Sequence, residues 1–129
     1  MEPVVLPNGI GEELESVART TIGDELRSIT YFDEDDQVEQ IYLRSDLEQT
    51  ADLIGFAELE RMGFQSHAAY RNTQLGTYHG TIRMFENGFL ARVIGAACGV
   101  WVTTDSMSID RFDELVSAIT PIIKSLEQQ

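Results

Sequence analysis

Residues 81–94 read TIRMFENGFLARVI, in which the dipeptide Asn87-Gly88 separates two apolar runs. Because Asn and Gly both tolerate positive φ, this dipeptide is the strongest short signal for a β-hairpin with a two-residue type I′ turn. The β-branched and aromatic residues on either side of the dipeptide favour strands. The stretch therefore predicts an antiparallel pair of strands.

The turn also predicts which residues of the hairpin face one another. With Asn87-Gly88 as the two turn residues, Phe85 is expected to face Leu90, and Arg83 to face Arg92. Two like charges opposed on one face are unfavourable unless something negative lies between them. That negative group is either a carboxylate of this chain, for instance from a middle helix, or a bound anion or partner carboxylate held by the guanidinium groups. Arg83 and Arg92 are therefore the candidate ligand-binding residues.

The two faces of this hairpin differ in character. One face carries Ile82, Met84, Ala91 and Val93, and we expect it in the core. The arginine face is too apolar to be fully exposed, so a middle helix or a second subunit should cover it. Candidate interface residues are the apolar side chains of the arginine face together with the tryptophan of the final predicted strand, namely Phe85, Leu90, Ile94 and Trp101.

Three segments have the apolar spacing of helices. The first begins near Gly11, and the last follows a possible cap at Ser106 or Ser108. Between them, Leu47 to about Met62 predicts a middle helix. Pro121 lies inside the last helix, where it is expected to bend the helix without ending it.

The remaining strands complete the predicted fold. They are expected over Arg27–Phe32, Val38–Arg44 and Val100–Thr104. The element order is thus helix, two strands, helix, three strands, helix. Strands joined by hairpins imply a five-stranded, largely antiparallel sheet with helices packed on it. We expect one α+β domain over residues 1–129, with residues 1–9 as an irregular lead-in.

This element order resembles that of the roadblock domains, which are small dimeric scaffolds with a roadblock/profilin-like topology. The likeness is topological and covers nearly the whole chain. In sequence, GDELRSITYF…VEQIYLRSDL, followed by GTIRMFENG and GVWVTTD, resembles a small haloarchaeal family without assigned function. That resemblance covers about 100 residues and implies no activity.

Charge is the strongest global signal. Asp and Glu number 22 against 9 basic residues, the formal net charge is −13, and Lys124 is the only lysine. Molar salt shortens the Debye length to about 3 Å and removes most of the resulting self-repulsion. The composition therefore predicts a halophilic protein, with an acidic mimic or a cation binder as the alternative. Nonspecific nucleic-acid binding is disfavoured, because phosphate contacts need a basic surface.

Other global features concern the cellular compartment. Cys98 is the single cysteine, so no intrachain disulfide can form and a reducing interior is expected. No apolar run approaches the length of a membrane span, and the first residues lack the pattern of a signal peptide. We expect a cytoplasmic protein that does not bind membranes.

The acidic run YFDEDDQV, residues 31–38, raises the question of a cation site. An EF-hand loop that started at Asp33 would require Gly at its sixth position and a carboxylate at its twelfth. Those positions hold Val38 and Arg44, so the loop fails where its geometry is most demanding. A solvated turn between two strands is the favoured interpretation, with a weak cation site as the alternative.

No catalytic constellation stands out. His67 and His79 lack a carboxylate or cysteine at a familiar metal-ligand spacing, and a zinc site needs three or four convergent ligands. The small residues of 95–99, GAACG, would leave the Cys98 thiol accessible, although a lone cysteine is usually a buried hydrophobe. No metal, cofactor or catalytic residue is predicted.

Three functions remain as hypotheses. The favoured one is a non-enzymatic scaffold or regulatory module whose partner is a second copy of itself or another protein. The alternative is a sensor of small anionic ligands that uses Arg83 and Arg92. The third is a thiol-dependent enzyme that acts through Cys98.

Overall fold

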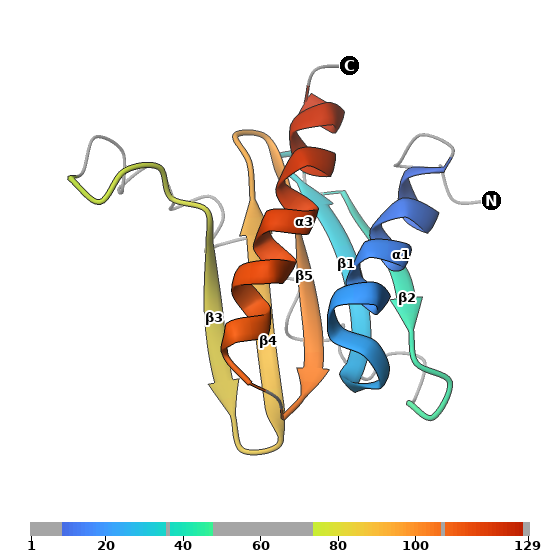
Figure 1. Ribbon diagram of the computed structural model, residues 1–129. Coiled ribbons are helices and arrows are strands. Elements are labelled where there is room, and N and C mark those ends of the chain that lie inside the picture. Colours follow the sequence, from blue (N-terminus) through green and yellow to red (C-terminus); the bar gives the residue numbers. More distant parts are fainter. Residues whose placement is uncertain (1–8, 36, 48–73, 107, 128–129) are drawn as a thin grey trace.

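The computed structural model describes residues 9–35, 37–47, 74–106 and 108–127. In these ranges, five antiparallel strands form one sheet in the order β2-β1-β5-β4-β3, and helices cover one of its faces (Figure 1). The elements are α1 (Ile10–Ile22), the 3₁₀ helix η1 (Gly23–Glu25), β1 (Leu26–Asp33), β2 (Val38–Leu43), β3 (Gly80–Phe85), β4 (Gly88–Ile94), β5 (Cys98–Asp105) and α3 (Asp110–Glu127). The predicted α+β fold class is confirmed.

Helix α1 follows from its apolar stripe and from its ends. Leu14, Ala18 and Ile22 recur at a spacing of four residues and are buried. Acidic side chains in the first turn complement the positive end of the helix dipole. The helix ends at Gly23, which adopts a φ of 76° and donates its backbone N–H to the carbonyl of Arg19. A left-handed residue at this position is most easily a glycine.

Helix α3 begins at Asp110, five residues after Asp105, the last residue of β5. The backbone N–H of Asp110 donates to the hydroxyl oxygen of Ser108, which was one of the two predicted caps, at 3.3 Å. Pro121 lies inside the helix, which continues past it to Glu127. Neither helix in the described ranges has the length and the apolar character needed to cross a bilayer.

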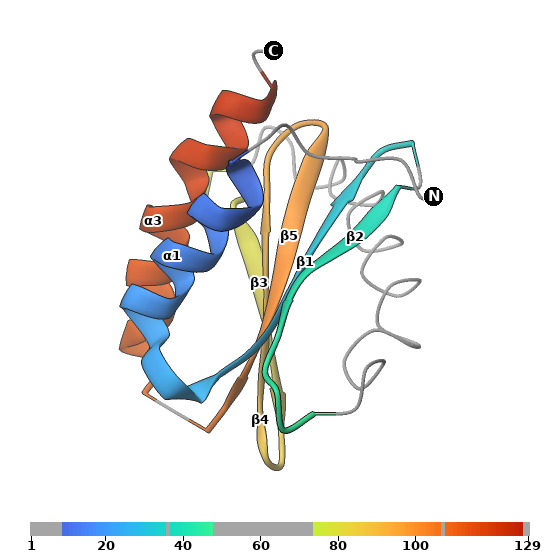
Figure 2. The same ribbon diagram turned by 90° about the vertical axis from the view of Figure 1, so that its right-hand side faces the viewer.

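The main core lies between the sheet and the two helices, which share one side of it (Figure 2). Helices α1 and α3 pack against each other as well as on the sheet. The sheet contributes inward-facing residues of its three central strands. These are Ile29 and Tyr31 of β1, Ala91 and Val93 of β4, and Val100 and Val102 of β5.

A second, smaller cluster lies on the opposite face of the sheet. It consists of Phe32, Leu90, Ile94 and Trp101, all of them buried. The rings of Phe32 and Trp101 stack with their centroids 5.6 Å apart. The middle helix predicted over Leu47 to about Met62 lies, from residue 48 on, outside the described residues. That such a helix covers this face therefore stays a prediction.

The pairing of β3 with β4 differs from the predicted one by two residues. The turn consists of Glu86-Asn87, Arg83 faces Leu90, and Arg92 faces Thr81. The prediction that Arg83 directly opposes Arg92 is therefore wrong. Because side chains alternate with a period of two, the shift leaves both arginines on the same face, now as diagonal neighbours.

Gly88 explains this register. It is the first residue of β4 and pairs with Asp105 of β5. A Cβ atom at Gly88 would collide with the carbonyl oxygen of Thr104. The glycine therefore serves the close approach of two backbones, and the tight turn lies one residue earlier than the dipeptide signal indicated.

Candidate interaction surface

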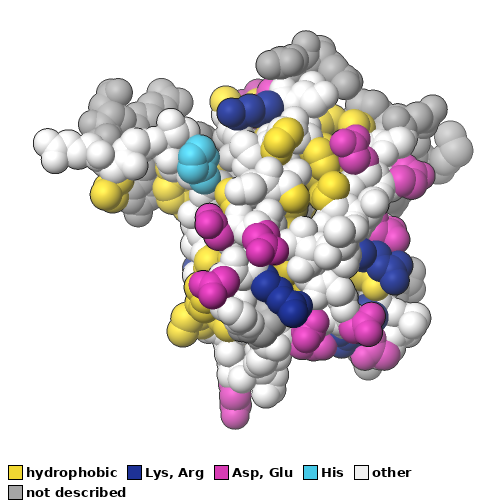
Figure 3. Space-filling view, in the orientation of Figure 1, with side chains coloured by type: hydrophobic (Ala, Val, Ile, Leu, Met, Phe, Trp, Pro, Cys, Tyr) yellow, Lys and Arg dark blue, Asp and Glu magenta, His cyan; other side chains and the backbone are white. Residues whose placement is uncertain are grey.

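Strand β3 is the most exposed strand of the sheet. In the described residues it pairs with β4 alone and forms one edge of the sheet. Its last four residues are exposed, with Ile82 and Met84 (72% exposed) on the helix face and Phe85 (51%) on the other face. Hydrophobic side chains are visible at the lower left of the molecule, where β3 lies (Figures 1 and 3). Apolar side chains thus flank both sides of this edge.

This exposure corrects one prediction. Ile82 and Met84 were expected in the core with Ala91 and Val93, and only the latter two are buried. The reason is the position of α3, which packs on β4 and β5 and leaves β3 beside it uncovered (Figure 1). The alternating pattern of the hairpin identified which face of each strand points to the helices. It could not show that the helices stop short of β3.

The predicted interface residues divide in a similar way. Leu90, Ile94 and Trp101 are buried within the single chain. They therefore cannot meet a partner in this conformation of the chain. Phe85 is the one member of the predicted set that is exposed, and it belongs to β3.

The two predicted ligand-binding arginines lie in different environments. Arg92 is 3% exposed, and its Nη2 donates to the hydroxyl oxygens of Tyr78 and Thr81, both at 3.1 Å. Tyr78 and Thr81 are also hydrogen-bonded to each other. Arg83, two positions along the neighbouring strand, is exposed. Polar groups of the chain itself therefore bind Arg92, whereas Arg83 projects from the surface of the edge strand.

Arg44 forms a charged junction that the sequence did not reveal. Its Nη1 donates to Asp105 Oδ2 at 2.7 Å and to the carbonyl oxygen of Asp24 at 3.0 Å, and its Nε donates to Asp46 Oδ1 at 2.6 Å. These hydrogen bonds from Arg44 hold the pKa of the Asp105 and Asp46 carboxyls below their usual range. Asp46 is close to Arg44 in the sequence, but Asp105 reaches Arg44 only because β1 pairs with both β2 and β5, so no short motif marks the whole junction.

Cys98 does not have the predicted accessible thiol. The residue is 4% exposed, and burial, reinforced by the negative charge of Glu127, raises the pKa of the thiol to about 12. The same Glu127 carboxylate accepts hydrogen bonds from the backbone N–H groups of Ala97 and Cys98. His67 lies outside the described residues, and His79 is exposed. The accessible thiol that the thiol-enzyme hypothesis requires is therefore not present in the described structure.

The acidic turn uses one of its carboxylates to hold its own backbone. Asp33 Oδ1 accepts the backbone N–H groups of Asp35 at 2.9 Å and of Gln37 at 3.0 Å. This local geometry is typical of aspartate in turns. Over the described ranges, no three His, Cys, Asp or Glu side chains are grouped so that they could hold a metal ion.

Three solved structures of roadblock-type proteins have the same fold, and each is 16% identical to this chain. The gliding protein MglB of Thermus thermophilus has a TM-score of 0.67, covering 97% of this chain and 99% of that one. MglB of Myxococcus xanthus has a TM-score of 0.61, with 95% and 96% covered. A Roadblock/LC7 domain from Streptomyces avermitilis has a TM-score of 0.56, with 84% and 90% covered.

These neighbours confirm the predicted likeness to roadblock domains, and at this level of identity they establish the fold alone. No curated protein matches the chain significantly. Residues 12–124 match the family described as Domain of unknown function (DUF7522). Since the match spans most of the sequence, the chain belongs to this family.

Proposed function

We propose that this domain is a non-enzymatic interaction module that pairs with a second copy of itself through the outer edge of β3. The observation that carries the proposal is the exposure of Ile82, Met84 and Phe85 on the two sides of one edge strand. The backbone of an edge strand can pair with a strand of another molecule and so extend the sheet. Exposed apolar side chains on such a strand are typical of a contact surface.

Antiparallel pairing of two β3 strands would join two sheets into one across a two-fold axis. Each copy would then add its sheet to the sheet of the other and bury part of its Met84 side chain, which is 72% exposed in the single chain. One solved structure of this fold is described as MglB with a tetrameric arrangement, which is consistent with an assembling role for the fold. An assembling role suits a scaffold or a regulatory subunit.

Charge sets the conditions under which such pairing is stable. Two copies with a formal net charge of −13 each repel one another at low ionic strength. Salt screens this repulsion and strengthens apolar contacts, so we infer adaptation to a salt-rich cytoplasm. Self-association should accordingly strengthen as salt is raised.

The sensor hypothesis built on Arg83 and Arg92 has weaker support. An anion held by both guanidinium groups would need Arg92 to exchange its bonds to Tyr78 and Thr81 for bonds to the ligand. Arg92 is also almost completely buried, which limits the approach of a ligand from solvent.

Sedimentation equilibrium in molar salt tests the proposal. We expect the wild-type chain to dimerise and Met84→Lys to weaken the dimer at least about tenfold, because the substitution removes apolar contact and places like charges near the axis. Ile109→Lys is the matched control, since Ile109 is similarly apolar, 52% exposed and outside β3. A wild-type chain that stays monomeric at high concentration, or equal weakening by both variants, would contradict the proposal.

A further inference from the structure

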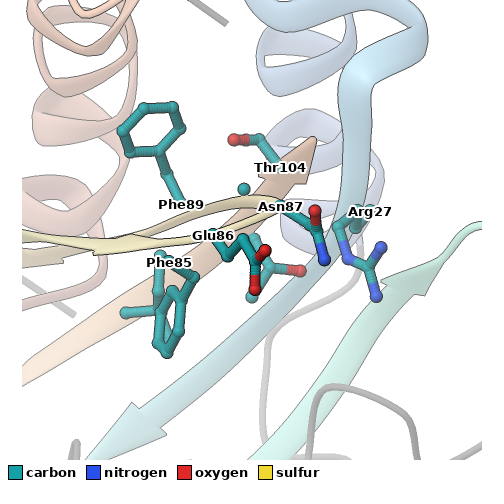
Figure 4. A pocket seen from close by; sticks show the side chains of 9 residues that line it. Arg27, Phe85, Glu86, Asn87, Phe89 and Thr104 are labelled. Atoms are coloured by element: carbon teal, nitrogen blue, oxygen red, sulfur yellow. The ribbon is translucent and has the colours of Figure 1, made fainter. Parts of the chain in front are cut away.

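A pocket of about 420 Å³ opens at the turn end of the β3–β4 hairpin. Arg27 of β1, residues 85–90 of the hairpin, and Thr103 and Thr104 of β5 line it (Figure 4). Its volume lies in the range of about 300–1,000 Å³ that is common for small-molecule sites. The pocket does not include the outer edge of β3. Phe85 is the one exposed apolar residue of that strand that also lines the pocket.

The pocket combines two opposite charges with an apolar wall. Figure 4 shows the carboxylate of Glu86, the amide of Asn87 and the guanidinium of Arg27 in succession along one side of the sheet. The Phe85 ring lies on that same side, whereas Phe89 projects to the helix side and meets the ring of Phe112 at 5.2 Å between centroids. A ligand in the pocket would thus meet a negative group, a positive group and an aromatic ring.

Arg27 owes its position to an irregularity in the sheet. The pairing of β1 with β5 shifts register between Leu26 and Ser28, so Arg27 lies within a β-bulge. Bulges redirect side chains and are common beside functional sites. Arg27 Nη1 lies 3.5 Å from Asp105 Oδ1, which holds the guanidinium at the pocket and leaves its side chain 28% exposed.

One hydroxyl group of the pocket lining, that of Thr103, already has a hydrogen-bond partner within the chain. The hydroxyl groups of Ser28 and Thr103 are hydrogen-bonded to each other at 2.6 Å and buried. Beside them, Leu90 is also buried. The hydroxyl oxygen of Thr104, which also lines the pocket, is buried and has no hydrogen-bond partner among the described residues. The charged groups of the lining are Arg27 and Glu86, and they lie at the rim.

The geometry points to a free α-amino acid with an apolar side chain as the ligand of this pocket. Its carboxylate would bind the guanidinium of Arg27 and the amide of Asn87, its ammonium group would bind Glu86, and its side chain would pack on the exposed ring of Phe85. Planar guanidinium groups suit carboxylates, and an aromatic ring beside a carboxylate suits an ammonium group.

A zwitterion fits better than an ion of either sign. A purely anionic ligand would meet the Glu86 carboxylate, a charge of the same sign, at the rim of the pocket. A simple amine would meet the guanidinium of Arg27, a charge of the same sign, in the pocket lining. A ligand that carries both charges can bind Arg27 through its carboxylate and Glu86 through its ammonium group at the same time.

Isothermal titration calorimetry with L-leucine and L-phenylalanine, at a salt concentration that keeps the chain folded, tests this inference. We expect both amino acids to bind. Glu86→Gln and Arg27→Gln should each weaken binding by at least about tenfold, since each removes one charge-assisted contact. Arg83→Gln, on the same hairpin but outside the pocket, and Glu34→Gln, on the distant acidic turn, are the matched controls and should bind as the wild type does.

Two truncated ligands isolate the two charges. We expect 4-methylpentanoate, which lacks the ammonium group of leucine, and 3-methylbutylamine, which lacks its carboxylate, each to bind at least about tenfold more weakly than leucine. Equal binding of 4-methylpentanoate and leucine would overturn the inference, and so would the absence of binding by both amino acids.

The variants are chosen so that a folding defect cannot imitate a binding defect. Glu86 is an exposed turn residue, so Glu86→Gln should keep the wild-type melting temperature even if Arg27→Gln, which loses its contact to Asp105, does not. Wild-type binding by Glu86→Gln would count against the inference by itself. Met84→Lys should leave leucine binding unchanged, so the ligand site and the proposed dimer can fail independently.

Discussion

Strands β3 and β4 are the two arms of one hairpin, and they lie in opposite environments. Both carry apolar residues and one arginine each, in GTIRMF and GFLARVI. All of β4 is buried apart from half-buried Phe89, whereas the last four residues of β3 are exposed. The difference arises from neighbours, because β4 has strands on both sides and α3 above it, and the described structure gives β3 a strand on one side only.

The position of a strand in a small sheet decides whether its apolar residues form part of the core or an interaction surface. An apolar strand at the centre of the sheet stabilises the fold, and an equally apolar strand at the edge presents the same residue types to other molecules. The same side-chain chemistry therefore has two consequences, which differ only through position. Three experiments test the contrast between the central and the peripheral parts of the sheet.

The largest effect is expected for apolar truncation of the central strand. Leu90→Ala should lower the free energy of unfolding by about 3 kcal/mol, because it leaves a cavity in a packed cluster. Met84→Ala, on the exposed arm, should change it by less than about 0.5 kcal/mol in the monomer. Urea unfolding at low protein concentration measures both, and similar losses in the two variants would contradict the contrast.

The arginines offer an intermediate test of the same contrast. Arg92→Ala should lower the free energy of unfolding by about 2 kcal/mol, since it removes a buried stem and the hydrogen bonds to Tyr78 and Thr81. Arg83→Ala should cost less than about 1 kcal/mol, as is usual for an exposed arginine. Thermal unfolding followed by circular dichroism ranks the two variants, and a larger loss for Arg83→Ala would reverse the assignment of the two environments.

The smallest effect is expected at the partly exposed end of β5, where Asp105 pairs with Arg44. The pKa of Asp105 is lowered in the folded state, so the pair stabilises the fold above the unfolded pKa of about 3.9 and this contribution is lost as the pH falls through the folded value. Asp105→Asn should cost about 1 kcal/mol at pH 7, a small amount because the pair is partly exposed to solvent, and less as the pH falls below the unfolded pKa.

Melting temperatures of wild type and Asp105→Asn between pH 2 and 7 measure this difference, with Glu34→Gln as an exposed-carboxylate control. A gap between wild type and Asp105→Asn that stays constant over the whole range would show that the carboxylate charge contributes nothing. A gap that widens as the pH falls would contradict the sign of the pKa shift.

Short-range sequence patterns predicted much of the fold and less of the candidate site. Periodicity located α1 and α3, and turn chemistry located the hairpins, since both depend on residues close in sequence. The register of the β3–β4 hairpin was missed by two residues because the tight contact of Gly88 with Thr104 comes from β5, a separate strand. The pocket at Arg27 was missed because a bulge, which no short motif marks, redirects that side chain.

The amino-acid sequence alone specifies an acidic α+β domain, the faces of its strands and the turns between them, because these depend on composition and on short-range periodicity. It does not say which strand lies at the edge, which arginine is buried or whether Cys98 is accessible. Those properties depend on the order β2-β1-β5-β4-β3 and on where α3 lies across it. Burial, unlike periodicity, is a property of neighbours that are distant in the chain.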